Sequence, residues 1–189
     1  MYFGPTNHRL RISLDDVAPE VWRRVEVASD TTLPQLAKVL VAAMGWEGYH
    51  LHQFVVAGMY FGPGDGETSR FTIPYEHITL EQIAREGAEF EWHYDFGDSW
   101  SHRVVVEHVG EPERADAPAC LGGARACPPE DCGGSGGYDH LLEVLADPSD
   151  EDHDDMLEWV GGGFDPEAFD REVVREHLRL LRPKGEPRR

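Results

Sequence analysis

The sequence predicts an α+β domain in which helices cover one face of a mostly antiparallel sheet, and three observations support this prediction. Alternating apolar and polar residues, typical of half-buried strands, occur in two pairs of segments that are each joined by a turn. A segment with helical spacing follows the first pair. A second amphipathic helical pattern comes at the end of the chain, so the order of elements favours α+β over a parallel α/β fold.

The first hairpin and the helix after it have the clearest local patterns. Residues 10–14 alternate in polarity, residues 15–20 supply turn chemistry, and a second alternation runs over residues 21–27. Capping residues at 30–32 precede a helical repeat that ends at Gly45, which suits a helix C-terminus. The apolar positions of this predicted helix are Leu33, Leu36, Ala37, Leu40 and Met44.

Further strands are expected in the middle of the chain. Residues 50–58 read as a strand that residues 59–61 can extend, and residues 68–75 form a candidate edge strand closed by Pro74. A short helix follows at residues 80–84. The second hairpin then pairs a strand at residues 88–96 with a valine-rich strand at 102–109.

The last third of the chain begins with a long stretch without periodicity, residues 110–137, in which we expect a loop held by some specific interaction. Segments at 138–145 and 156–160 lead into a last helix, capped by Asp165 or Asp170. The apolar stripe of that helix comprises Phe169, Val173, Val174, His177, Leu178 and Leu181. We therefore expect one domain over residues 1–182, followed by a basic tail at 183–189.

The composition restricts the class of protein. Seventeen basic against 36 acidic residues give 17 − 36 = −19, a charge that disfavours direct binding to nucleic acid. The N-terminus lacks the pattern of a signal peptide, and no apolar run approaches the ~20 residues of a membrane span, so a cytoplasmic protein without membrane contact is expected. The sequence does not determine an oligomeric state.

The three cysteines, Cys120, Cys127 and Cys132, lie in the long predicted loop with gaps of six and four residues. An odd number in a reducing compartment argues against a disulfide framework. Three thiolates and one histidine would complete a tetrahedral zinc site and would explain how the loop stays ordered. Ordinary buried or free thiols are the alternative, because only the second gap fits a zinc knuckle.

Residues 93–102 are unusually dense in functional groups. Strand alternation places His93 and Asp95 on one polar face, and Asp98 and His102 lie across the tight turn. These side chains could orient one another or bind a metal. Alternatively they serve the turn itself, with Gly97 at positive φ, Asp98 as a capping residue and the Asp95 carboxylate accepting from nearby amides.

Two other groups are candidate ligands or catalysts. His50 and His52 would share one face of a strand, a spacing that suits two imidazoles on one metal, although surface histidines have the same pattern. Glu130 and Asp131 lie between two prolines and two glycines, a context that can present a general acid or base or form a plain acidic loop. The acidic run at 147–155 lacks the glycine and final glutamate of an EF-hand.

Five motifs together resemble the plasmid pRiA4b ORF-3-like family, in order as well as in content. They are Val21-Trp22-Arg23-Arg24, Ala43-Met44-Gly45-Trp46, His50-Leu51-His52-Gln53-Phe54, Tyr94-Asp95-Phe96-Gly97-Asp98-Ser99-Trp100 with His102, and Pro128-Pro129-Glu130-Asp131-Cys132-Gly133-Gly134. The resemblance runs from about Arg9 to Leu181 and implies an α/β roll, in which curved antiparallel strands wrap the early helix. It also implies an association with plasmids and mobile elements, but it carries over no reaction or catalytic residue.

Three functions follow from these patterns. The first is a binding or accessory module that contacts a protein or a small ligand through a polar site of His50, His52, His93, Asp95, Asp98 and His102, with the cysteine-rich loop beside it. The second is a metal-dependent hydrolase-like enzyme in which histidines and aspartate hold a divalent ion and Glu130 or Asp131 moves a proton. The third is an acidic partner of a nucleic-acid-processing protein that imitates phosphate charge.

Overall fold

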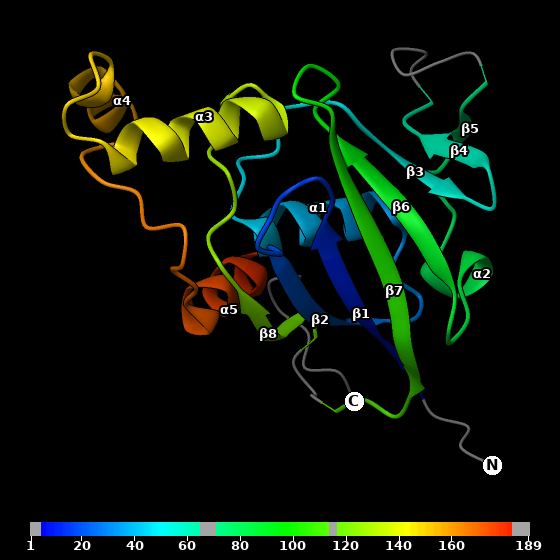
Figure 1. Ribbon diagram of the computed structural model, residues 1–189. Helices are drawn as coiled ribbons and strands as arrows, with labels where there is room; N and C mark the ends of the chain where they lie inside the picture. Colours follow the sequence, from blue (N-terminus) through cyan, green and yellow to red (C-terminus); the bar gives the residue numbers. More distant parts are fainter. Residues whose placement is uncertain (1–4, 65–70, 114–116, 183–189) are drawn as a thin grey trace.

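A single mixed sheet organises the protein. The computed structural model describes residues 5–64, 71–113 and 117–182, and the sheet has the strand order β5-β4-β3-β6-β7-β1-β2-β8 (Figure 1). The strand pairs within it are antiparallel except for β4 and β5, which are parallel. The predicted α+β class with a mostly antiparallel sheet is therefore confirmed.

The strands are β1 (Asn7–Leu14), β2 (Trp22–Ala28), β3 (His52–Val56), β4 (Met59–Gly62), β5 (Ile73–Pro74), β6 (Glu89–Tyr94), β7 (Trp100–Gly110) and β8 (Ala119–Ala124). The helices of the described residues are α1 (Leu33–Met44), α2 (Leu80–Ile83), α3 (Gly134–Ala146), α4 (His153–Trp159) and α5 (Arg171–Leu180). None of these helices is long and apolar enough to cross a membrane.

Helix α1 forms where its caps and apolar spacing predict it. The Thr32 amide donates to the Gln35 side chain at 3.0 Å, and Gly45 ends the helix at φ 98° with its amide bonded to the Val41 carbonyl. The predicted apolar positions of α1 are buried, and the helix lies across one face of the sheet with α5 beside it (Figure 1). This packing places the C-terminal end of α1, and the segment that follows it, beside β6 and β7.

The expected continuous strand over residues 50–61 is instead a hairpin. Ala57 and Gly58 both have positive φ, the conformation of a two-residue turn that matches strand twist, so β4 folds back on β3. The prediction missed this turn because alanine gives no turn signal. The predicted edge strand at 68–75 is at the sheet edge as the two-residue β5, and residues 68–70 lie outside the described part of the chain.

The segment expected to be one long loop contains β8, which pairs with β2. Its Leu-Gly-Gly-Ala sequence shows no alternation, and β8 forms because β2 offers an otherwise open edge. Helix α5 is capped by Asp170, whose carboxylate accepts from the Glu172 amide at 2.8 Å. Within its predicted stripe Val174 and Leu178 are buried, whereas Val173 is half exposed. The predicted basic tail at 183–189 lies outside the described residues.

Candidate functional site

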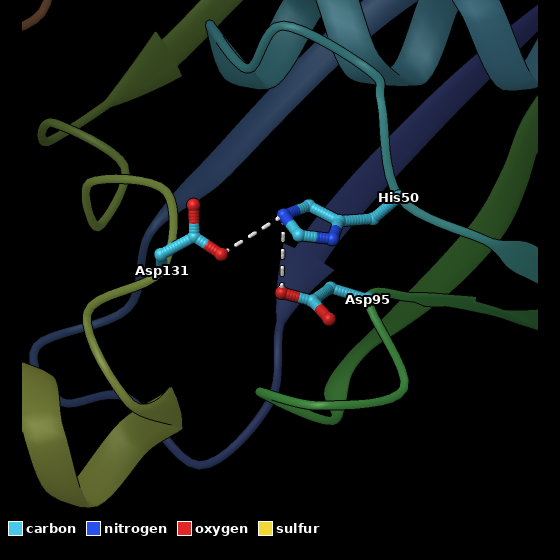
Figure 2. Close-up of side chains that lie close together, drawn as sticks. All are labelled: His50, Asp95 and Asp131. Atoms are coloured by element: carbon cyan, nitrogen blue, oxygen red, sulfur yellow. Dashed lines mark ion pairs between the residues drawn. The ribbon is translucent and has the colours of Figure 1, made fainter.

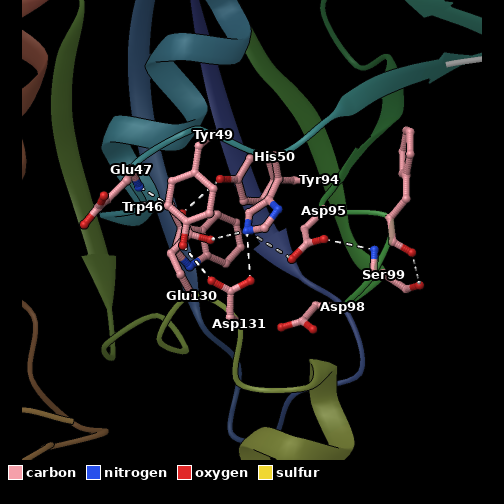
Figure 3. Close-up of polar contacts among 12 residues, drawn as sticks. Trp46, Glu47, Tyr49, His50, Tyr94, Asp95, Asp98, Ser99, Glu130 and Asp131 are labelled. Carbon is pink, nitrogen blue, oxygen red and sulfur yellow. Dashed lines mark hydrogen bonds and ion pairs between the residues drawn. The ribbon is translucent and has the colours of Figure 1, made fainter. Parts of the chain in front are cut away.

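Three connections that are far apart in the sequence meet at one end of the sheet. They are the segment 45–51 between α1 and β3, the turn 95–99 between β6 and β7, and the segment 128–133 that leads into α3 (Figure 3). The Trp46 indole donates to the Pro128 carbonyl at 2.9 Å, and the Gly133 amide donates to Asp98 at 3.1 Å. These bonds tie the third connection to the other two.

The aromatic core beneath these connections positions the first of them. The Trp46 ring stacks on Tyr94 with centroids 4.9 Å apart and lies 6.1 Å from Trp100. All three side chains are buried. The chain therefore leaves α1 in a fixed direction, and His50 lies over the end of β6.

One histidine nitrogen lies among three carboxylates. His50 Nε2 is 3.2 Å from Asp131 Oδ1, 3.5 Å from Asp95 Oδ2 and 3.7 Å from Glu130 Oε2. Figure 2 shows Asp95 and Asp131 approaching this nitrogen from the β6-β7 turn and from the segment before α3. We call His50, Asp95, Glu130 and Asp131 the carboxylate-histidine site.

Two buried atoms at the centre of this site have no hydrogen-bond partner among the residues that the structure describes. His50 Nε2 and Glu130 Oε2 are both inaccessible to solvent, and neither makes a hydrogen bond of acceptable geometry. Buried polar atoms are normally satisfied, so each such exception calls for an explanation. One explanation is a ligand that all four side chains share.

Each carboxylate of the site has one oxygen held by the protein and another that faces His50. Glu130 Oε1 accepts from the Glu47 amide and from the Tyr94 hydroxyl, both at 2.9 Å. Asp131 Oδ2 accepts from the Tyr49 hydroxyl at 2.7 Å. The outer oxygens are thus used for positioning and the inner ones are left facing the nitrogen.

Asp95 follows the same pattern. Its Oδ1 accepts from the Gly97 amide at 2.9 Å, its Oδ2 faces His50, and its side chain is only 8% exposed. Asp95 has φ 55°, and Asp131 has φ 57°. Positive φ is uncommon outside glycine and is found repeatedly at functional sites, where surrounding contacts hold it in place.

The two tyrosines that donate to the site have raised pKa values. Burial, followed by the hydrogen bond to Glu130, raises the pKa of Tyr94, and the hydrogen bond to Asp131 raises that of Tyr49. Both hydroxyls therefore stay protonated and remain donors to their carboxylates. Sequence reasoning did not select either residue, although Tyr94 lies in a quoted motif.

The structure separates the histidines that were predicted to act together. His50 precedes β3 rather than lying in it, so strand alternation does not place it beside His52. The His52 ring bonds to the Tyr75 hydroxyl at 2.8 Å, and burial lowers the pKa of His52. His93 contacts Glu91 at 2.7 Å on the outer side of β6.

His102 is a core residue. It is completely buried, its Nδ1 lies 3.1 Å from the Trp92 carbonyl, and burial lowers the pKa of His102 to about 3. Asp98 neither caps its own turn nor reaches His50, because it binds the Gly133 amide. In the turn itself the positive φ angles belong to Asp95 and Ser99, not to Gly97.

The three thiols lie in different surroundings. Cys120 is buried on β8 with its thiol 3.5 Å from the Gly122 carbonyl, Cys127 lies near the Arg23 guanidinium, and Cys132 lies at the start of α3. Burial raises the pKa of Cys127 and of Cys132 to about 12. Within the described residues the group of three metal-ligating side chains that converges is His50, Asp95 and Asp131, with no cysteine. This geometry gives the predicted zinc clamp no support.

Comparison with known proteins gives three findings. The model of the family described as plasmid pRiA4b ORF-3-like protein matches residues 6–173. "Uncharacterized protein y4hQ" of Sinorhizobium fredii (strain NBRC 101917 / NGR234) is 40% identical over 155 residues, which cover 81% of this chain and 80% of that protein. A crystal structure titled as the protein of unknown function MM3350 from Methanosarcina mazei Go1 has a TM-score of 0.81 and 34% identity, and the match covers 89% of this chain and 97% of that chain.

Proposed function

The chain belongs to the plasmid pRiA4b ORF-3-like family, and from that premise we propose that it is a divalent-cation-binding module whose ligands are His50, Asp95, Glu130 and Asp131. The observation that carries this proposal is the buried His50 Nε2, which faces three carboxylate oxygens and bonds to none of them. More broadly, we propose that this module has an accessory role in the cell.

The distances suit ligands that share one ion. With metal-ligand bonds of ~2.1 Å, neighbouring ligand atoms lie about 3.4 Å apart in a tetrahedron and about 3.0 Å apart in an octahedron. The three separations from His50 Nε2 are 3.2, 3.5 and 3.7 Å. The ligand atoms of His50, Asp95 and Asp131 also lie within 4.8 Å of one another, whereas Glu130 is outside this group and would have to move closer to share the ion.

A proton on His50 Nε2 is a weaker explanation of the same geometry. A ring N–H carries one hydrogen and can point at one oxygen, whereas Asp95, Glu130 and Asp131 each present one. Three carboxylates around one imidazole would also leave two negative charges uncompensated in a partly buried place. A divalent ion leaves only one of the three carboxylate charges uncompensated and can accept several ligands at once.

The donor set indicates the class of cation. One imidazole and three carboxylates suit Mn²⁺, Fe²⁺, Co²⁺ or Zn²⁺ better than Ca²⁺, which prefers oxygen alone, or Cu⁺, which prefers sulfur. The hydrogen bonds from Tyr94, Tyr49 and Gly97 would act as the outer contacts that orient metal ligands.

The test is titration of chelator-treated protein with Mn²⁺ and Zn²⁺ by isothermal calorimetry, with metal content measured on protein purified without chelator. One ion per chain is expected, and His50→Ala and Glu130→Gln should each weaken binding at least ~10-fold. His93→Ala is the matched control, because His93 lies on the outer side of β6. Binding that survives His50→Ala but not His93→Ala would overturn the proposal.

A metal-dependent hydrolase is the second candidate function. The observation that favours it is the exposure of Asp131, whose side chain is 60% exposed while Asp95 and Glu130 are largely buried. The site is therefore open on one side, where a metal-bound water could meet a substrate. The test is hydrolysis of activated esters and phosphoesters. Hydrolysis that depends on added Mn²⁺ and is lost in His50→Ala would support this function. Metal binding without turnover would support the cation-binding module instead.

A further inference from the structure

We propose that the cleft between α3 and α4 binds an organic cation, an amine with an apolar body, beside the carboxylate-histidine site. The cleft has a volume of about 550 Å³, within the range of small-molecule sites. Asp131 lines it, so the cleft shares one residue with the carboxylate-histidine site. The proposal goes beyond the proposed function and does not require a bound metal, although the cleft shares Asp131 with the proposed metal site.

One face of α4 forms a wall of the cleft. Asp152, Asp155, Met156 and Trp159 recur at spacings of three and four residues, which place them on the same side of the helix. Leu141 of α3 lies opposite them. Figure 1 shows this pair of helices extending beyond the sheet, so their facing surfaces are not covered by it.

The apolar part of the wall includes an exposed tryptophan. Trp159 is 52% exposed, although tryptophan is among the most costly side chains to leave in water. Met156 lies one turn earlier, and Leu141 is buried at the base. A flat ring, a thioether and a leucine together form a surface for an apolar ligand body.

The charged part of the wall selects the sign of the ligand. Asp131, Asp152 and Asp155 line the cleft, and among its described lining residues none is lysine or arginine. The whole chain carries a net charge of −19, so an anion would be repelled from this surface. A cation is attracted both by the carboxylates and by the face of the Trp159 ring.

The separation of the carboxylates favours an organic cation over a metal ion. In the described part of the chain, neither Asp152 nor Asp155 belongs to a group of three ligand atoms close enough to share one ion. His140, which also lines the cleft, belongs to none either. A cation that fills the space must therefore be polyatomic, with its charge near the aspartates and its apolar part on Trp159.

The experiment uses the full chain in chelator, so that amine binding is measured without metal. Phenethylamine is the probe, 2-phenylethanol its neutral counterpart and phenylacetate its anionic one, with binding followed by tryptophan fluorescence and by calorimetry. Phenethylamine should bind at least ~5-fold more tightly than the alcohol, because only the amine gains the ionic and cation-π contacts. Phenylacetate should be the weakest of the three.

Variants of the cleft residues separate the contributions of the carboxylates and of the tryptophan ring to phenethylamine binding. Asp152→Asn combined with Asp155→Asn should weaken phenethylamine binding about 10-fold, and Trp159→Leu about 3-fold. Glu143→Gln is the matched control, because Glu143 is exposed on α3 and does not line the cleft. Each variant should retain the wild-type melting temperature within ~2 °C. If α4 unfolds separately from the rest of the chain, unfolding in urea would be measured in place of thermal unfolding.

The two proposals fail in different ways. His50→Ala should weaken metal binding at least ~10-fold and leave phenethylamine binding unchanged, because His50 does not line the cleft. Loss of metal binding alone therefore leaves the cleft proposal intact. Equal affinity for the amine and the alcohol, tighter binding of phenylacetate, or no effect of the double aspartate variant would overturn the cleft proposal.

Discussion

Replacing Asp131 by asparagine should stabilise the metal-free protein and destabilise the metal-loaded one. Ligand oxygens of Asp95 and Asp131 lie within 4.8 Å of each other. Two unit charges at that distance repel by about 0.9 kcal/mol in bulk water and about 3.5 kcal/mol at an effective dielectric constant of 20. Because the Asp131 side chain is 60% exposed, the lower figure applies, and a gain of about 1 kcal/mol is expected.

Asparagine keeps the rest of the local structure. Its amide oxygen can accept from the Tyr49 hydroxyl as Asp131 Oδ2 does, and asparagine tolerates the φ of 57° found there. With metal at 100 times its dissociation constant, binding stabilises the wild type by about 2.7 kcal/mol. A 10-fold loss of affinity in the variant removes about 1.3 kcal/mol of that gain, which exceeds the ~1 kcal/mol gained from relieved repulsion.

The assay is urea unfolding of both proteins in chelator and in excess Mn²⁺, repeated in high salt. Asp139→Asn is the matched control, because Asp139 is exposed on α3 outside the site. The metal-free gain should shrink at high salt, since screening weakens charge repulsion. A metal-free Asp131→Asn protein that is less stable than the wild type, or equal metal stabilisation of both, would refute the reasoning.

Three further predictions concern the core and the loops around the site. Burial lowers the pKa of His102 to about 3 from 6.5, so below pH 6.5 the unfolded chain takes up a proton that the folded chain does not. The contribution of His102 should therefore lower the free energy of unfolding by about 1.4 kcal/mol for each pH unit by which the pH falls below 6.5. Urea unfolding at pH 7.5, 6 and 5 measures the slope, and an equal slope in His102→Gln would contradict the assignment. Trp46→Phe removes the hydrogen bond from the indole to the Pro128 carbonyl, so it should lower the free energy of unfolding by about 1 kcal/mol and weaken Mn²⁺ binding. An unchanged calorimetric titration would show that this bond does not position the site. Cys127 and Cys132, with pKa values raised to about 12, should react with iodoacetamide at pH 8 far more slowly than in the urea-unfolded chain, and equal rates by mass spectrometry would contradict their burial.

The parts of the fold that sequence predicted are those fixed by local chemistry. The first hairpin follows from alternation, and α1 follows from its caps and Gly45. Strand β8 has no such signal, because its glycines contribute no periodicity and its pairing partner β2 lies 93 to 102 residues earlier in the chain. The turn at Ala57 was missed for a related reason, since tertiary pairing of β3 and β4 imposes a positive φ on an ordinary residue.

The candidate site shows where strand alternation misleads. It placed Asp95 on the same face as His93, yet Asp95 has left the strand and its φ of 55° turns the side chain toward His50. His50 likewise precedes the strand that was expected to pair it with His52. All four members of the site were named as candidates, but their grouping depends on contacts between segments some 35 to 80 residues apart, which no local pattern encodes.

The way the site is assembled argues for a ligand rather than for structural ion pairing. If the carboxylates served only to hold the three connections together, both oxygens of each would be expected to accept bonds from amides or hydroxyls, because buried oxygens without partners are costly. Glu130 instead receives two donors on Oε1 while its buried Oε2 has none, and the buried Nε2 of His50 has none either. The Tyr94 hydroxyl and the Glu47 amide both donate to Glu130 Oε1, so Glu130 Oε2 is held in a fixed position facing the imidazole. A preformed arrangement of this kind is costly to the protein alone and becomes favourable once a cation occupies the space between the four side chains. Metal should therefore raise the stability of the wild type more than that of any variant that lacks one of these four side chains.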